Sequence, residues 1–124
     1  MDITPQFPKD KNNINSYGPQ GFIINKKIYK NAVIMNSEQL FEININFLPE
    51  INMEILRQIL HSELEILIIG TGKSHLFIAD NLKEQIKNSY PLIAINEMDS
   101  GAACRTYNIL ATEDRKVAVI LMPL

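Results

Sequence analysis

The stretch ELEILIIGTGKSHLF, residues 63 to 77, decides the fold of this chain. Residues 66 to 69 are apolar at every position, which is typical of a strand covered on both faces at the centre of a sheet with helices packed on it. The strand leads directly into the turn Gly70-Thr71-Gly72. In open α/β sheets, crevices form beyond the carboxyl ends of such strands, so this turn borders the first candidate for a ligand pocket.

The glycine turn contains only part of a nucleotide-binding motif. Gly72-Lys73-Ser74 matches the end of a Walker loop, but the first glycine of that motif would fall on Leu67, inside the strand. The third glycine of a dinucleotide fingerprint would fall on His75. The pattern therefore favours a tight strand exit, where glycine permits positive φ, and leaves a turn that contacts a ligand as the alternative.

The remaining elements follow from hydrophobic periodicity and from capping and turn residues. We expect strands at residues 21–25, 28–35, 39–47, 92–95 and 116–122, and helices at 53–61, 79–87 and from Asp99 or Ser100 to about 108. This order predicts an α/β domain of three layers with a mixed central sheet, an N-terminal antiparallel hairpin part, and helices packed on the later strands. Residues 1–16 are predicted to form a flexible arm before a single domain at 17–124. Within the first 20 residues, only Tyr17 is an anchor-like side chain.

Composition limits the functional classes. The chain has 124 residues, 46% of them hydrophobic, and a formal net charge of −2 without a basic cluster, which argues against a nucleic-acid partner. Its start lacks the features of a secretory signal, and its apolar runs are far shorter than the ~20 residues of a membrane span. A single cysteine suits a reducing compartment. We expect a bacterial cytoplasmic protein without a membrane span.

A second dense stretch, NEMDSGAACRTYNIL, occupies residues 96 to 110. As a helix it places Ala103 and Tyr107 on one face, Arg105 on the opposite face and Cys104 at the border. Cys104 is either a nucleophile, with His75 or His61 as its base, or a packing residue, and the helix-interior position favours packing. Arg105 either binds an anion or pairs with Asp99, Glu97 or a main-chain carbonyl.

The candidate ligand-binding set joins the turn to the start of this helix, where free N–H groups can hold an anion. It consists of Gly70, Thr71, Gly72, Asp99, Ser100, Cys104 and Arg105. We identify no catalytic set and expect no cofactor. Two histidines and one cysteine without metal-ligand spacing predict no metal site.

Both motifs resemble the family that includes mitochondrial NADH:ubiquinone oxidoreductase (complex I) assembly factor 3 and uncharacterised bacterial and archaeal proteins. The matching positions are Gly70, Thr71, Gly72, Met98, Asp99 and residues 102–108; Ser100 and Lys26 stand where the family commonly has threonine and glycine. The resemblance implies a three-layer domain around a mixed sheet, no established enzymatic activity and, in the eukaryotic branch, complex I assembly through protein partners.

Two hypotheses of function result. The first is a non-enzymatic protein-binding or assembly factor that acts with subunits of a respiratory membrane complex at the inner face of a membrane. The alternative is a domain, or an enzyme, that binds a small anionic ligand between the Gly70–Gly72 turn and the helix start at Asp99.

Overall fold

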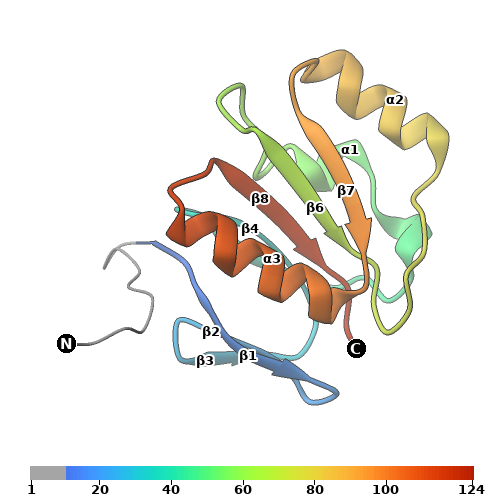
Figure 1. The fold of residues 1–124 in the computed structure, drawn as a ribbon. Helices are drawn as coiled ribbons and strands as arrows, with labels where there is room; N and C mark the ends of the chain where they lie inside the picture. The colour runs from blue at the N-terminus through green and yellow to red at the C-terminus, as the bar shows by residue number, and fades with distance from the viewer. Residues whose placement is uncertain (1–10) are drawn as a thin grey trace.

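A five-stranded mixed sheet and a separate three-stranded antiparallel sheet form the framework of the fold (Figure 1). The computed structural model describes residues 11–124. The central sheet has the strand order β5-β4-β8-β6-β7, and the small sheet has the order β1-β2-β3. The strands are β1 Ile14–Gly18, β2 Gly21–Ile24, β3 Lys27–Tyr29, β4 Ala32–Asn36, β5 Leu40–Ile43, β6 Ile66–Gly70, β7 Ala94–Met98 and β8 Val117–Leu121; the helices are η1 Leu48–Glu50, α1 Met53–Leu56, α2 Asp80–Ser89 and α3 Ser100–Thr112.

The continuous apolar stretch at residues 66 to 69 forms β6, inside the central sheet. β6 pairs in parallel with β7 and β8, and β4 pairs antiparallel with β8 and β5. Every residue of β4 and β8 is buried. The expected α/β class with a mixed central sheet is therefore confirmed.

Alternate residues of β6 pack into two different cores, which defines the three layers. Leu67 and Ile69 belong to a core that also contains buried side chains of α1 and α2. Ile68 belongs to a second core, which contains buried residues of α3 and of the small sheet. α1 and α2 thus cover one face of the central sheet, and α3 together with the small sheet covers the other (Figure 1).

The expected N-terminal hairpin forms, but in the small sheet. The strand predicted at residues 28–35 is interrupted, because β3 lies in the small sheet and β4 in the central one. The Glu42 side chain marks the crossing, since its Oε2 accepts hydrogen bonds from the backbone N–H groups of Lys30 and Asn31, at 3.1 and 3.2 Å. Period-two patterning cannot reveal such a change of sheet.

Two other expected elements are shorter than their sequence patterns. The strand predicted at 39–47 ends at Ile43, and Phe47 is 70% exposed. The Glu50 carboxylate accepts the backbone N–H groups of Asn46 and Phe47, which turns the chain into η1. The helix predicted at 53–61 is a regular α-helix only over Met53–Leu56, and Asn52 caps it as expected.

The N-terminal segment is anchored from residue 12 onward. Asn12 is buried, and its Nδ2 donates to the carbonyl groups of Asn36 and Gln39 at 2.8 and 2.9 Å. Ile14 begins β1. Residues 11–16 of the predicted arm therefore make ordered contacts, and residues 1–10 lie outside the described part of the chain.

Candidate functional site

The glycine turn and the start of α3 lie against each other at the carboxyl ends of β6 and β7. The backbone N–H of Thr71 donates to the Met98 carbonyl at 2.8 Å. Gly72 and Ser100 exchange two hydrogen bonds: Ser100 N–H donates to the Gly72 carbonyl at 2.8 Å, and Gly72 N–H donates to Ser100 Oγ at 2.9 Å. The buried Ser100 hydroxyl donates in turn to the Met122 carbonyl at 2.6 Å. Parallel pairing of these strands brings the two sequence motifs together, as expected.

Each glycine of the turn has its own steric reason. Gly72 has a φ of +103°, a conformation that side chains with a Cβ rarely adopt. Gly70 allows β6 to approach α3 closely, because a Cβ there would lie 3.0 Å from Ala103 Cβ and 3.1 Å from the Ile120 carbonyl oxygen. These constraints are those of a tight strand exit.

Thr71 shapes the loop that follows the turn. Its buried hydroxyl donates to the Ser74 carbonyl at 2.6 Å and accepts the backbone N–H of Leu76 at 3.0 Å. The Thr71 hydroxyl therefore fixes the backbone path of residues 74–76.

At the start of α3, Asp99 acts as the cap and Arg105 contacts Tyr17. Asp99 Oδ1 accepts the backbone N–H of Ala102 at 2.9 Å. Arg105 Nη1 donates to the Tyr17 hydroxyl, and the guanidinium lies 5.9 Å from the centre of the Tyr17 ring. That ring also packs on Gly101, where a Cβ would lie 3.1 Å from Tyr17 Cε2. The partner of Arg105 is thus a tyrosine, and neither a carboxylate nor a main-chain carbonyl as predicted from the sequence.

Cys104 is fully buried in the core formed by α3, the central sheet and the small sheet. Burial raises the pKa of its thiol to about 12, against a smaller opposite effect of the neighbouring Arg105 charge. The thiol is therefore protonated at neutral pH and is a poor nucleophile there. Tyr107 is also buried, with its hydroxyl donating to the Asn12 carbonyl at 3.1 Å, and burial raises its pKa.

The candidate residues thus lie together in the fold, but their backbone N–H groups already form intramolecular hydrogen bonds. The N–H groups of Thr71, Gly72, Ser100 and Ala102 all have intramolecular acceptors. Among residues 11–124, no three His, Cys, Asp or Glu side chains gather where they could hold a metal ion. Ligand binding by Gly70, Thr71, Gly72, Asp99, Ser100, Cys104 and Arg105 stays a prediction.

The loop after the turn exposes two apolar side chains, Leu76 and Phe77, which no sequence motif indicated. Leu76 is 49% and Phe77 67% exposed. The next residue, Ile78, is held by the Glu97 carboxylate, which accepts its backbone N–H at 2.6 Å and also pairs with Lys83 Nζ at 2.7 Å. The signal in the sequence is an apolar pair within a polar loop that has neither helical nor strand periodicity.

A cavity of about 330 Å³ adjoins Phe77, and its lining is apolar. The Phe77 ring has two polar neighbours. The centroid of the His75 ring lies 4.8 Å from its own, and Lys83 Nζ lies 5.5 Å from its centroid. The lining residues come from η1, the loop and the start of α2: Leu48, Pro49, Ile51, Phe77, Ile78, Ala79 and Leu82.

Comparison with known proteins identifies the family. Residues 14–122 match the family described as "Protein of unknown function (DUF498/DUF598)". The chain belongs to this family. A Francisella tularensis relative named "13 kDa major membrane protein" is 32% identical over 103 residues, which are 82% of each chain.

A Xenopus tropicalis relative is named NADH dehydrogenase (ubiquinone) 1 alpha subcomplex assembly factor 3. It is 30% identical over 112 residues, which are 89% of this chain and 60% of that protein. The chain thus spans less than two thirds of this curated relative. The resemblance to the family of this assembly factor is confirmed.

The same architecture occurs in a solved structure. The crystal structure of a Bordetella parapertussis protein superposes with a TM-score of 0.83 at 26% identity, and the match covers 94% of this chain and 98% of that one. In the part of this chain that the structure describes, no helix is long and apolar enough to cross a membrane.

Proposed function

We propose that this protein is a non-enzymatic assembly factor that binds subunits of a respiratory membrane complex. The observation that carries the proposal is the fixed presentation of Leu76 and Phe77 beside an apolar cavity. Thr71 holds the backbone of Leu76, and Glu97 holds that of Ile78, so the backbone is fixed on both sides of Phe77. The polar side chains of Thr71 and Glu97 therefore order the loop that we propose as the binding surface.

Exposed, ordered aromatic side chains are typical anchors of protein interfaces. An anchor binds best when its position is fixed before association, because less conformational entropy is lost. Phe77 meets this condition, since hydrogen bonds hold the residues before and after it. The adjoining cavity offers room for apolar side chains of a partner.

The nature of the partner is proposed from relatives. The Xenopus tropicalis relative is named as an assembly factor of NADH dehydrogenase, and it aligns with 89% of this chain. We extend that role to subunits of a complex I-like assembly, with this chain acting through binding.

For location, we propose the cytoplasmic side of a bacterial inner membrane, with the protein peripheral to the bilayer. Two facts support a peripheral position. The Francisella tularensis relative is named a membrane protein, while residues 11–124 contain no helix able to span a bilayer.

Native affinity capture tests the proposal. The wild-type chain, expressed from its own locus, is expected to retain subunits of a respiratory complex, and its deletion is expected to lower the amount of assembled complex. The double variant Leu76→Ser, Phe77→Ser is expected to lose these subunits. A matched control is Leu92→Ser, Ile109→Ser, because both side chains are exposed on other elements.

Two outcomes would contradict the proposal. In the first, no subunit of a membrane complex is captured and the deletion leaves complex levels unchanged. In the second, the Leu76 and Phe77 double variant captures the same subunits as the control, so that the loop has no part in binding.

A further inference from the structure

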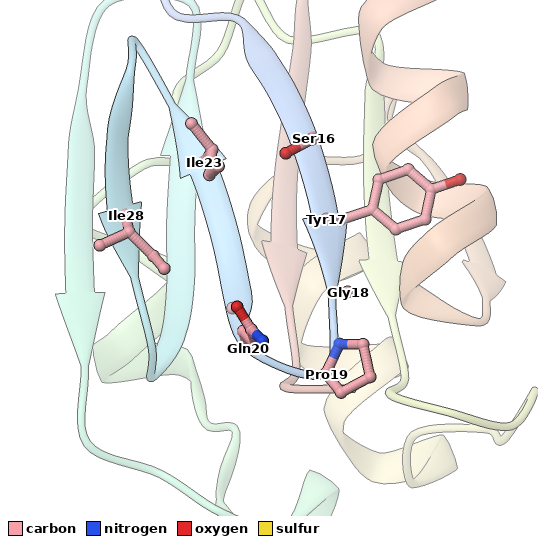
Figure 2. A pocket seen from close by; sticks show the side chains of 8 residues that line it. Ser16, Tyr17, Gly18, Pro19, Gln20, Ile23 and Ile28 are labelled. Carbon is pink, nitrogen blue, oxygen red and sulfur yellow. The ribbon is translucent and has the colours of Figure 1, made fainter.

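The outer face of the small sheet combines apolar and basic side chains. The opposite face of this sheet packs into the core through Ile14, Phe22 and Ile24. On the outer face, Ile23 of β2 and Ile28 of β3 form a cross-strand pair, and Ile28 is 47% exposed. Figure 2 shows these two side chains on neighbouring strands, with Tyr17 directed away from them toward α3.

Two hollows mark this face. One, of about 260 Å³, is lined by Ile23, Ile28 and the hairpin residues from Ser16 to Gly21 (Figure 2). The other, of about 570 Å³, is lined by Pro19, Gln20, Ile28 and Lys30. They share Pro19, Gln20 and Ile28, so the exposed Ile28 side chain adjoins Lys30.

Charge is distributed unevenly along the chain. Residues 11–37 contain four lysines and no Asp or Glu, a formal charge of +4. Residues 38–124 contain seven Lys and Arg and twelve Asp and Glu, a formal charge of −5. The small sheet is therefore a basic surface on a protein that is acidic elsewhere.

Two of the four lysines are available for a partner on this face. Lys11 pairs with Glu38 at 2.7 Å. Lys27 lies opposite the buried Ile24 in the register of β2 and β3, so it belongs to the inner face, and its Nζ lies 5.6 Å from the centre of the Tyr29 ring. Lys26 and Lys30 are exposed, and they take part in none of the ion pairs formed within residues 11–124. The Glu42 carboxylate accepts the backbone N–H groups of Lys30 and Asn31.

The lysines are held in place by a rigid hairpin. Asn25 and Lys26 both have positive φ, 53° and 68°, as in the tight two-residue turn that joins β2 to β3. The Lys26 N–H donates to Asn15 Oδ1 at 2.7 Å, and the Asn25 amide donates to Asn12 Oδ1 at 2.7 Å. Asparagine side chains from the N-terminal segment thus fix the turn.

We propose that this face binds the surface of an anionic phospholipid bilayer, with Lys26 and Lys30 at the headgroups and Ile28 in the interfacial layer. The inference rests on the peripheral location proposed above. Lysine ammonium groups are point charges without a fixed donor fork, so they suit mobile anionic headgroups. An apolar side chain flanked by lysines is a typical combination for an interfacial contact.

The overall charge favours a bilayer over nucleic acid. A flat membrane contacts one face only, so the acidic remainder of the chain can point away from it. A nucleic acid that extended beyond the small sheet would meet that acidic remainder. Charge complementarity therefore selects an anionic surface that is broad and planar.

Vesicle flotation with the purified chain tests the inference. The probes are vesicles of phosphatidylcholine alone and vesicles with a third of phosphatidylglycerol, at low and high salt. The wild-type chain is expected to float with anionic vesicles only, and to be released by salt. Lys26→Gln, Lys30→Gln is expected to lower the partition coefficient about fivefold per lysine, roughly 25-fold in all.

A second double variant controls for net charge. Arg57→Gln, Lys116→Gln removes the same charge from exposed positions outside the small sheet, and it is expected to bind like the wild type. Thermal unfolding verifies that both variants are folded. Ile28→Ser is expected to weaken binding at low salt without changing its dependence on salt, because its contribution is apolar.

Three results would overturn the inference: no flotation of the wild type, equal losses in the two double variants, or lysine-dependent binding of a short DNA duplex without binding of vesicles. The outcome is separate from that of the capture experiment. Loss of capture in the Leu76 and Phe77 variant with unchanged flotation concerns the protein partner only, and the reverse pattern concerns the lipid surface only.

Discussion

The side-chain amide of Asn108 binds both backbone polar groups of Ile14, a residue 94 positions away in the chain. The Ile14 N–H donates to Asn108 Oδ1 at 3.1 Å, and Asn108 Nδ2 donates to the Ile14 carbonyl at 2.7 Å. The amide thereby occupies the edge of β1 as a neighbouring strand would. This residue of the second motif attaches the small sheet to α3.

Replacement of Asn108 by alanine is expected to loosen the small sheet. Two backbone groups of β1 would lose their partners, at a cost of roughly 1–3 kcal/mol in the free energy of unfolding. Urea denaturation measures the loss, and amide hydrogen exchange is expected to accelerate in β1 more than in β6. Asn108→Asp keeps the acceptor but lacks the donor, so it should fall between the two. Uniform exchange in all strands would contradict this assignment.

Thr71→Val is expected to release the loop that carries Leu76 and Phe77. Valine has a similar shape but cannot accept the Leu76 N–H or donate to the Ser74 carbonyl. We expect a loss of about 1–3 kcal/mol in stability, faster hydrogen exchange at Leu76, and weaker capture of a partner protein.

Thr71→Ser is the matched control, because it keeps the hydroxyl and should retain slow exchange at Leu76. If valine left the exchange rate of Leu76 unchanged, the hydroxyl would not be what orders the loop.

Gly70→Ala is expected to destabilise the domain, because the added Cβ would lie 3.0 Å from Ala103 Cβ and 3.1 Å from a backbone oxygen. Either β6 or α3 must shift, which costs typically 1–3 kcal/mol. Gly18→Ala is the control, since nothing lies within 4 Å of a Cβ at that position. Thermal unfolding should show a lower midpoint for the Gly70 variant only, and equal midpoints would refute the proposed contact between β6 and α3.

Local patterns in the sequence predicted the buried centre of the fold better than its surface. Ile66 to Ile69 gave the position of β6, and the chain order gave the meeting of Gly72 with Ser100, because both depend on parallel strands with short connections. The change of sheet at Lys30 could not be predicted, since it depends on Glu42, which is distant in sequence and binds that backbone.

The sequence predicted the position of the candidate site but not the hydrogen-bond partners of its residues. Spacing placed Asp99 and Gly72 near each other, while the partner of each polar group is a property of the folded chain. Tyr17 as the contact of Arg105, and the side-chain amide of Asn108 against β1, join residues about 90 positions apart. Leu76 and Phe77 carry no periodic signal, so their exposure became evident only from the loop path.

Burial of Cys104 predicts a specific dependence of stability on pH. The thiol pKa is raised from 9.0 to about 12 in the folded protein, mainly by desolvation. Between these values the unfolded chain releases the proton and the folded chain keeps it, so the unfolded state is favoured as pH rises. The contribution of this thiol to stability is therefore complete below pH 9 and is lost as pH rises toward about 12.

Urea denaturation from pH 7 to 10.5 measures this effect against Cys104→Ala. Alanine leaves a small cavity, so the variant is expected to be less stable at pH 7 by about 1 kcal/mol. The difference between the two proteins should shrink above pH 9, because only the wild type has the thiol. Labelling with iodoacetamide at pH 8 should be slow for the folded wild type and fast in urea. Rapid labelling of the folded protein, or a difference in stability that does not change with pH, would show that solvent reaches this thiol.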